Sequence, residues 1–370
     1  MKKQTIAIIG ASVGQRVLFE KAKELGLRTI DFAWEQGAFC KDLADVYYPL
    51  SIYDTDRILR ICQEENVVGI VSTCSDITAE VVSKLTTTMG LRGIPYESFL
   101  KLKDKAAIRR LLSDVDELSQ IWSFIYTNQT PNSYPCIVKP CTGASKKGVS
   151  FVNEESQFNE AIKYAKESTE GDILVEQFID GHEISVESIS FEGKHFVIQI
   201  TDKDSTGSPH FVEIGHHQPS LLPSEIQDKI KRIIPRILDK VNLQNGASHI
   251  EMKITENGDV YLIEVNPRGG GDEISNTLVG LSTDYDYVKS MILVAIGAFK
   301  EKEVHNLGYA GIYFLCSQTK GYIDFFKHAD DKPWLVKKKV DTYDLSEGTT
   351  NYDRNGYLIY FDKEKVLINK

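Results

Sequence analysis

The stretch that decides the fold runs from His249 to Gly271 and reads HIEMKITENGDVYLIEVNPRGGG. Its Asn-Gly pair at 257–258 is typical of a hairpin turn, so we expect the strand of Glu251 to fold back against the strand of Glu264. Because side chains alternate along a strand, Glu264 and Asn266 face the same side. The sequence therefore predicts a point at which two carboxylates and one amide oxygen converge.

The oxygen ligands of this hairpin suit Mg²⁺, with Mn²⁺ as an alternative, because such a cation keeps some water and binds substrate phosphates in its remaining positions. We interpret Glu251, Glu264 and Asn266 as metal ligands. Arg268 follows at the same parity, where a fixed cation can neutralise a transferring phosphoryl group or a carboxylate. A solvated acidic hairpin would carry similar residues, but the ordered Glu-x-Asn-Pro-Arg run favours a metal site.

A second motif lies upstream, where an apolar strand ending in Lys139 and Pro140 is followed by CTGASKKGV at 141–149. The small residues between Gly143 and Gly148 expose backbone N–H groups, and two lysines add positive charge. Together these groups can wrap a triphosphate. The loop is not a Walker A loop, because no Lys-Ser/Thr pair follows its last glycine. Taken alone, the motif is equally compatible with an ordinary surface loop.

The third motif is VEQFIDGHE at 175–183, an apolar strand that runs into a glycine turn and then an acid. A flat apolar strand edge with free backbone groups suits an adenine ring, and the carboxylate of Glu183 suits ribose hydroxyls. Taken alone, such a pattern more commonly indicates an ordinary edge strand followed by a polar turn.

Short apolar runs alternate with helical patterns from Thr5 to about Gly93, which indicates a parallel sheet of the Rossmann type. The turn after its first strand, Gly10–Gly14, lacks the full GxGxxG spacing. We interpret this turn mainly as a tight connection between strand and helix, with a dinucleotide site as the weaker alternative.

The remaining chain divides by pattern. A charged helical stretch at Glu97–Leu112 follows Pro95 and marks a boundary near residue 100. Strands and helices are then mixed up to about residue 300, which favours an α+β class. Strands rich in Tyr and Phe follow, with no evident chemistry. We therefore expect three domains, at residues 1–100, 101–300 and 301–370, the last packing on the second.

In this order, with Lys105 before them, the three motifs resemble the ATP-grasp superfamily over about residues 100–300. The sequence FVEIGHHQP at 211–219 and ASHIE at 247–251 are similar to carboxylate–amine ligases that include the L-amino-acid ligases. The resemblance implies a Rossmann-like N-terminal domain followed by an ATP-grasp fold.

The resemblance also implies roles for single residues. Arg268 matches the arginine that stabilises the transition state, and Gly143–Gly148 matches the loop that closes over the triphosphate. The expected nucleotide contacts are Lys105, Lys139, Gly143, Ser145, Lys146, Gly148, Glu176, Phe178, Ile179 and Glu183. Glu213 and His216 are expected near the substrate. A structural role is the alternative for His216. Because the adjacent histidines 216 and 217 face opposite sides of a strand, we do not expect them to share one metal ion.

The implied activity is that of an ATP- and Mg²⁺-dependent ligase, which phosphorylates a carboxylate and joins it to an amine, releasing ADP and phosphate. Two alternatives stay open. One is an ATP-grasp carboxylase that uses bicarbonate, and the other is a non-catalytic ATP-binding regulator. The set of Glu251, Glu264, Asn266 and Arg268 argues against the regulator.

Composition limits the partners and the compartment. The net charge of −10 makes nucleic acid an unexpected partner. The six cysteines form no CxxC pair, which favours reduced thiols. The apolar run at 6–10 is short for a signal peptide, and no stretch approaches the ~20 apolar residues of a membrane span. We expect a cytoplasmic enzyme with small-molecule substrates, without a membrane or nucleic-acid partner, and a homodimer is common in such families.

Overall fold

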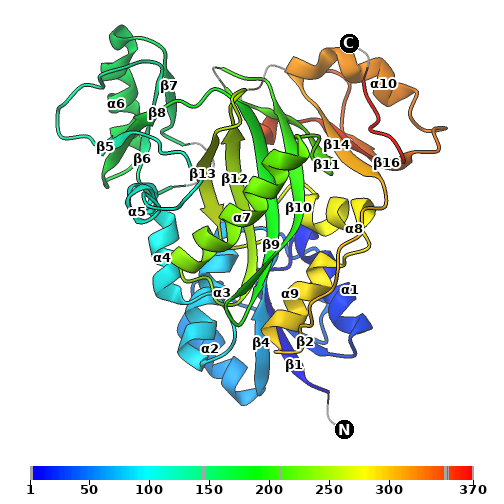
Figure 1. Cartoon of the computed structure of the whole chain (residues 1–370). Helices are drawn as coiled ribbons and strands as arrows, with labels where there is room; N and C mark the ends of the chain where they lie inside the picture. The colour runs from blue at the N-terminus through cyan, green and yellow to red at the C-terminus, as the bar shows by residue number, and fades with distance from the viewer. Residues whose placement is uncertain (1–2, 144–146, 209, 346–347, 349, 369–370) are drawn as a thin grey trace.

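The computed structural model describes residues 3–143, 147–208, 210–345, 348 and 350–368 (Figure 1). Within these ranges, no helix is long and apolar enough to cross a membrane. The described strands form three sheets, of four, eight and four strands.

The N-terminal sheet is parallel, as the alternating pattern predicted, and its strands lie in the order β3-β2-β1-β4. Its strands are β1 (Thr5–Ile9), β2 (Arg28–Ala33), β3 (Val46–Pro49) and β4 (Val67–Val71), and its helices are α1 (Arg16–Glu24), α2 (Thr55–Glu64) and α3 (Asp76–Met89). The carboxyl ends of these strands lead into loops that reach the centre of the molecule (Figure 1).

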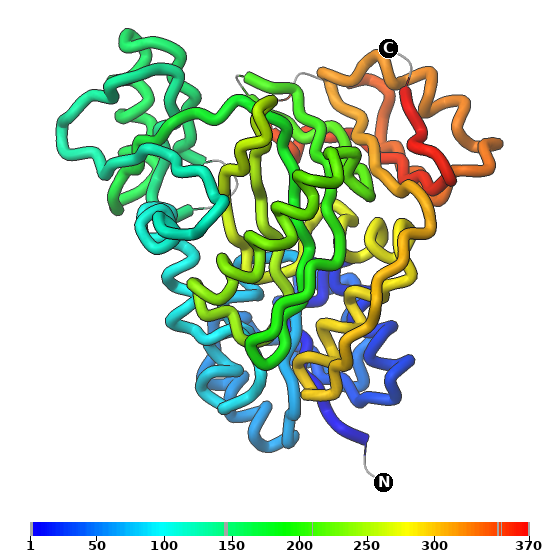
Figure 2. The backbone as a smooth tube through the Cα atoms, viewed as in Figure 1, coloured from blue at the N-terminus to red at the C-terminus, as the bar shows by residue number. Residues whose placement is uncertain are grey.

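One face of this sheet is covered by a helix from much later in the chain, α9 (Tyr287–Ala295). Figure 2 shows this helix in yellow beside the blue N-terminal segment. Gly69 on β4 permits the approach, because a Cβ atom there would lie 3.0 Å from the backbone carbonyl of Ala295. Val288 and Ile292 of the helix are buried against Ile6 and Ile8 of the sheet. The first and last thirds of the chain thus share one core.

The connection to the next unit contains two helices where the sequence predicted one helical stretch. They are α4 (Tyr96–Lys103) and α5 (Lys105–Leu111). Asp104 separates them, because its side chain accepts hydrogen bonds from the backbone N–H groups of Ala106 (2.9 Å) and Ala107 (3.1 Å) and so caps α5. The cap places Lys105 at the first turn of its own helix.

A small antiparallel sheet follows, in the order β5-β8-β6-β7. Its strands are β5 (Ser123–Ile125), β6 (Cys136–Pro140), β7 (Ser150–Val152) and β8 (Ile173–Gln177). Helix α6 (Phe158–Ser168) buries Phe158, Ile162 and Ala165 against it.

The third sheet is antiparallel and has the order β13-β12-β9-β10-β11-β14-β16-β15. Its strands are β9 (His182–Phe191), β10 (Lys194–Ser205), β11 (Glu213–Gln218), β12 (Gly246–Ile254), β13 (Val260–Asn266), β14 (Tyr309–Leu315), β15 (Leu335–Val340) and β16 (Gly356–Asp362). Shorter helices connect them: a π-helix (Ile274–Leu278), α8 (Val279–Ser282) and α10 (Ile323–Lys327). The C-terminal strands continue this sheet through the pairing of β14 with β11. We keep 1–100, 101–300 and 301–370 as a proposed division of the chain.

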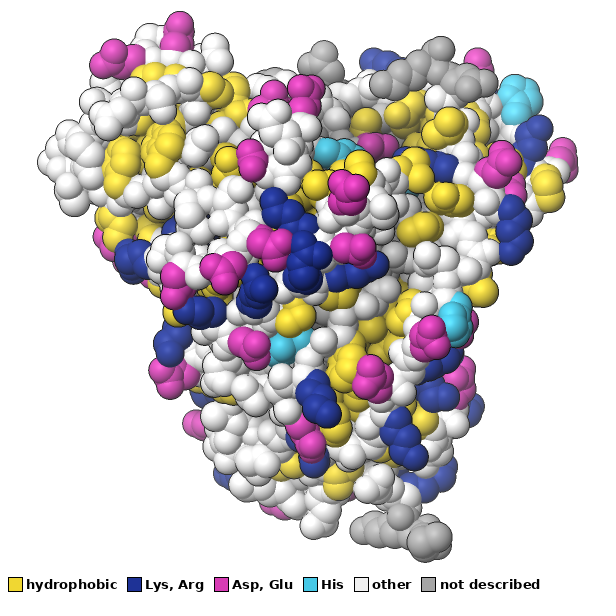
Figure 3. Space-filling view, viewed as in Figure 1, with side chains coloured by type: hydrophobic (Ala, Val, Ile, Leu, Met, Phe, Trp, Pro, Cys, Tyr) yellow, Lys and Arg dark blue, Asp and Glu magenta, His cyan; other side chains and the backbone are white. Residues whose placement is uncertain are grey.

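Helix α7 (Ser224–Lys240) covers one face of the large sheet with a row of buried isoleucines, Ile230, Ile233, Ile234 and Ile237. Its outer face carries charges of both signs (Figure 3). Arg232 forms an ion pair with Glu117 (2.7 Å), and Lys240 forms one with Asp114 (2.7 Å). This outer face therefore holds the loop after α5 and leaves the opposite face of the sheet for the candidate site.

Candidate active site

The predicted hairpin is present, and its two carboxylates are direct cross-strand partners. Glu251 on β12 lies opposite Glu264 on β13, and His249 lies opposite Asn266. Glu264 Oε1 is 3.3 Å from Lys105 Nζ, so the metal-ligand candidates and the first lysine candidate meet. The Nδ2 atom of Asn266 is buried and makes no hydrogen bond within the described residues. A buried donor without a partner is rare, and a phosphate oxygen would satisfy it.

These residues fit a divalent cation. Glu251, Glu264 and the amide oxygen of Asn266 are the hard oxygen donors that Mg²⁺ prefers. In the structure each carboxylate forms an ion pair with a lysine. Glu264 pairs with Lys105, and Glu251 pairs with Lys203. The hairpin therefore concentrates negative charge that is balanced by cations from two other elements.

The glycine loop begins beside the same lysine. Lys105 Nζ donates a hydrogen bond to the carbonyl oxygen of Gly143 (3.0 Å). Gly143 and Gly148 have φ values of +146° and +76°, a region that L side chains rarely adopt. A Cβ atom at Gly148 would also lie 2.6 Å from Ser168 Cβ. The candidates Ser145 and Lys146 lie outside the described residues.

The second lysine candidate, Lys139, forms a buried ion pair with Glu176. Arg109 completes the group, because its Nε donates to Glu176 Oε2 (3.1 Å) and its Nη2 to the carbonyl of Ile263 (3.1 Å). Burial lowers the pKa of Lys139. Burial alone would raise the pKa of Glu176, but Lys139 and Arg109 lower it. The Glu176 side chain is thus occupied by two cations. Its strand, β8, pairs with β5 on one side and β6 on the other, so it is an interior strand and the sequence prediction of a free strand edge was wrong here.

The expected adenine segment continues into an aromatic cluster. The ring of Phe178 lies 4.8 Å from that of Phe151 and 5.9 Å from that of Phe211, measured between centroids. Lys253 Nζ lies 5.0 Å from the Phe178 centroid. Ile179 beside it is 5% exposed. The apolar surface predicted for this segment is therefore formed by residues from three separate stretches.

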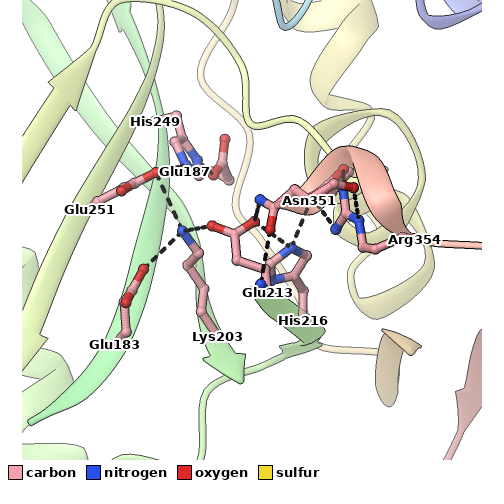
Figure 4. A network of polar contacts seen from close by, with 10 residues as sticks. Glu183, Glu187, Lys203, Glu213, His216, His249, Glu251, Asn351 and Arg354 are labelled. Carbon is pink, nitrogen blue, oxygen red and sulfur yellow. Dashed lines mark hydrogen bonds and ion pairs between the residues drawn. The ribbon is translucent and has the colours of Figure 1, made fainter. Parts of the chain in front are cut away.

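Lys203 on β10 joins three carboxylates that the sequence assigned to different roles (Figure 4). Its Nζ lies 3.1 Å from Glu183, 2.9 Å from Glu213 and 3.3 Å from Glu251. Its side chain is 3% exposed. Burial alone would lower the pKa of Lys203, but the three carboxylates raise it well above its usual value. Lys203 therefore brings the ribose, substrate and metal candidates into one network.

The two histidines face opposite sides of β11, as expected. His216 Nε2 lies 3.7 Å from Glu213 Oε2 and 3.5 Å from Asp272 Oδ2. His217 instead contacts Asp204 Oδ2 (3.0 Å) and the hydroxyl of Tyr360 (3.0 Å). His216 is therefore the histidine on the side of the candidate site.

The C-terminal segment supplies residues that the sequence analysis missed. Arg354 donates two hydrogen bonds of 2.8 Å to the carboxylate of Asp272, and Asn351 Nδ2 donates to Glu213 Oε2 (3.0 Å). Burial would raise the pKa of Asp272, but His216 and Arg354 hold it well below its usual value. The connection between β15 and β16 thus contributes polar groups to the network, although the sequence of this region showed no evident chemistry.

A second network reaches the metal candidates from the sheet interior. His249 Nδ1 lies 2.5 Å from Glu187 Oε1, and His249 Nε2 lies 3.2 Å from Glu251 Oε1. Burial alone would lower the pKa of His249, but Glu187 and Glu251 raise it to about 9. The two carboxylates therefore favour the protonated form of His249.

Arg268 lies where the large sheet meets the N-terminal unit. Its Nε donates to Asp76 Oδ1, at the start of α3, and its Nη1 donates to the carbonyl of Gly269 (3.1 Å). The loop then passes Asp272 and Glu273, both with positive φ (+50° and +65°), before the π-helix begins. Residues with such backbone angles cluster at functional sites.

Comparisons with known proteins identify the domain and the fold. Residues 132–277 match the model of the ATP-grasp domain. The solved structure of the L-amino acid ligase from Bacillus licheniformis superposes with a TM-score of 0.81, at 21% identity, over 98% of this chain and 94% of that one. Residues 132–277 therefore form an ATP-grasp domain, and the chain has the fold of that ligase structure.

Curated relatives add similarities in sequence. The chain is 27% identical over 274 residues to alanine–anticapsin ligase of Bacillus amyloliquefaciens, covering 63% of this chain and 57% of that one. It is 35% identical over 153 residues to D-alanine–D-alanine ligase of Geotalea uraniireducens, covering 39% and 46%. The chain thus spans about half the length of these relatives.

Proposed function

We propose that this chain is an ATP- and Mg²⁺-dependent ligase that activates a carboxylate as an acyl phosphate and joins it to an amine. The observation that carries the proposal is the facing pair of Glu251 and Glu264, with Lys105 on one carboxylate and Arg268 in the loop that follows. The similarity to ligases named for alanine and other amino acids supports an amino acid as one substrate.

The proposed chemistry needs placement and charge neutralisation more than a protein nucleophile. A carboxylate oxygen attacks the γ-phosphorus of ATP, ADP leaves, and an acyl phosphate forms. The amine then attacks the carbonyl carbon, phosphate leaves, and the amine loses a proton. Mg²⁺, when bound, would neutralise the phosphate oxygens. Lys105, Lys139 and Arg268 would hold the transferring group, as is general in phosphoryl transfer.

The other assignments remain part of the proposal. Gly143–Gly148 would cover the triphosphate and exclude water. Glu176, Phe178 and Ile179 would frame adenine, and Glu183 would bind ribose. Glu213 and His216 would line the substrate side. We also propose a cytoplasmic enzyme that acts on small molecules, which the free state of all six cysteines supports.

The test is an ADP-release screen with amino acids and small acids supplied in pairs, with hydroxylamine as a trap. Hydroxylamine attacks an acyl phosphate and gives a hydroxamate of the true carboxylate substrate. The expected result is ADP, phosphate and a hydroxamate. AMP as the product would contradict the mechanism. ADP release that depends on bicarbonate would indicate carboxylation, and nucleotide binding without turnover would indicate a regulator.

A further inference from the structure

Glu187 is a fully buried carboxylate on β9, at the centre of the region between the metal candidates and the arginine loop. Its side chain is 0% exposed. Its two oxygens have different partners: Oε1 lies 2.5 Å from His249 Nδ1, and Oε2 accepts a hydrogen bond from the backbone N–H of Gly270 (3.0 Å). One carboxylate therefore contacts two segments that are separate in the candidate site. Figure 4 shows Glu187 beside His249, the first of these contacts.

The first contact leads to the metal candidates. His249 holds Glu251 through its other nitrogen, at 3.2 Å from Oε1. Lys203 contacts the same oxygen of Glu251 at 3.3 Å. Both contacts use Oε1, so they fix the carboxylate while leaving its Oε2 atom out of these two interactions. Glu187 thus sets the ring of His249, which in turn sets the orientation of Glu251.

The second contact leads to the loop that follows Arg268. A Cβ atom at Gly270 would lie 2.7 Å from His249 Nδ1 and 2.8 Å from Glu187 Oε1. Only a glycine lets the backbone approach this closely without displacing the pair. The loop is therefore hydrogen-bonded to Glu187 at Gly270, two residues after Arg268.

Burying a carboxylate is costly, and stability alone does not explain it, because an apolar group of the same volume often serves as well. What Glu187 adds is a fixed orientation for the His249 ring and a fixed position for the Gly270 backbone. Partners behind a metal ligand fix its orientation, and their loss typically weakens metal binding.

We propose that Glu187 is a positioning residue that sets the metal-binding orientation of Glu251, through His249, and the position of the Arg268 loop, through Gly270. The proposal rests on the proposed function, because it takes Glu251 as a metal ligand. It assigns a role to two residues, Glu187 and His249, that lie behind the expected ligands.

The experiment measures Mn²⁺ binding by EPR to the full chain in the presence of a non-hydrolysable ATP analogue. Glu187→Gln keeps the shape of the side chain but cannot accept from both partners. Gly270→Ala keeps the carboxylate and pushes the pair apart. We expect each variant to bind Mn²⁺ about 10- to 100-fold more weakly than the parent. Affinity for the analogue in EDTA should be unchanged.

Asp202→Asn is the matched control. Asp202 is also buried in the large sheet, and it too contacts a histidine, His182 (3.0 Å), and accepts from a backbone N–H, that of Leu221 (2.9 Å). Its Mn²⁺ affinity should equal that of the parent, even if its unfolding temperature falls.

The outcomes separate the two ideas. If folded Glu187→Gln and Gly270→Ala bind Mn²⁺ like the parent, the positioning role is overturned while the proposed function stands. If Glu187→Gln does not fold, the Gly270→Ala result decides alone. If the parent itself binds no Mn²⁺ with the analogue present, the metal-dependent function fails, and the positioning role fails with it.

Discussion

Arg268 and Asp76 form an ion pair across 192 positions of sequence, and they join the loop after the metal hairpin to the first turn of α3 in the N-terminal unit. The Asp76 carboxylate contacts Nε of the guanidinium, which leaves the terminal nitrogens to other partners. The N-terminal unit therefore helps to orient the side chain of Arg268, which we propose to act on the phosphoryl group.

This pair predicts a result for a double-mutant cycle. Arg268→Ala should reduce hydroxamate formation by roughly 10²-fold or more, with little change in ATP affinity. Asp76→Asn should reduce it less, because the arginine is present but misaligned. If Asp76 acts through Arg268, adding Asp76→Asn to Arg268→Ala should cost nothing further. Full additivity of the two losses would show that Asp76 acts by another route.

Glu264 predicts a metal-specific defect. Glu264→Gln should leave the fold intact and lower Mg²⁺-dependent ATP turnover by orders of magnitude, because one of two facing carboxylates loses its charge. Adenine binding should be largely retained. The control is Glu256→Gln, an exposed glutamate in the turn of the same hairpin. Near-normal turnover by a well-folded Glu264→Gln protein would remove Glu264 from the metal site.

Asp31 predicts how stability depends on pH. It is buried in the N-terminal sheet, and neither carboxyl oxygen has a hydrogen-bond partner of normal geometry among the described residues. Burial raises its pKa from 3.8 to about 7, with the Phe32 backbone N–H opposing this in part. Between these values the folded state holds a proton that the unfolded state has released. The Asp31 contribution to stability is therefore complete below about pH 4 and lost as the pH rises through 7.

Asp31→Asn should remove this loss. The variant should be more stable than the parent at pH 8, by up to about 4 kcal/mol, and the difference should shrink toward pH 4. Urea unfolding at both pH values measures it. An equal difference at pH 4 and pH 8 would mean that Asp31 does not titrate in this range.

Arg354 predicts that the C-terminal segment contributes to activity. Arg354→Lys keeps the charge but loses the paired hydrogen bonds to Asp272, which lies beside His216. We expect kcat/KM to fall roughly tenfold or more from the misplaced groups. The matched control is Arg232→Lys on the outer face of α7, which also loses a two-nitrogen contact, to Glu117 in the loop after α5. Equal effects of the two variants would assign Arg354 to general stability.

The sequence predicted those parts of the site that lie on one short stretch. The turn at 257–258 predicted that the strand of Glu251 folds back against the strand of Glu264, and the structure has this hairpin. The direct pairing of the two glutamates depends on a register shift between Glu251 and Met252, which the local pattern does not show. The parallel N-terminal sheet was predictable for a similar reason, because strand and helix patterns alternate locally. One local prediction was incomplete: Asp104 divides the helical stretch in two, although its capping preference is visible in the sequence.

The missed residues depend on pairings between distant strands. Glu187 meets His249 only because β9 and β12 are neighbours in a register that no local pattern reveals. Lys203 reaches three carboxylates from three different strands, and Arg354 arrives from a segment 82 residues beyond Asp272. Among these missed residues, only Arg109 could have been found from a local pattern. It follows Lys105 by four residues, so the two side chains share one helix face.

The packing of α9 on the N-terminal sheet has a consequence for how the protein is made. Ile6, Ile8 and Val71 share a core with Val288 and Ile292 as well as with α1, so the cover of this face is incomplete until about 290 residues have left the ribosome. Until then the nascent chain exposes an apolar surface, which is the condition that invites aggregation and chaperone binding. A fragment that ends near residue 100 would keep α1 but would leave the part of this face that α9 covers permanently exposed, however complete its four strands were.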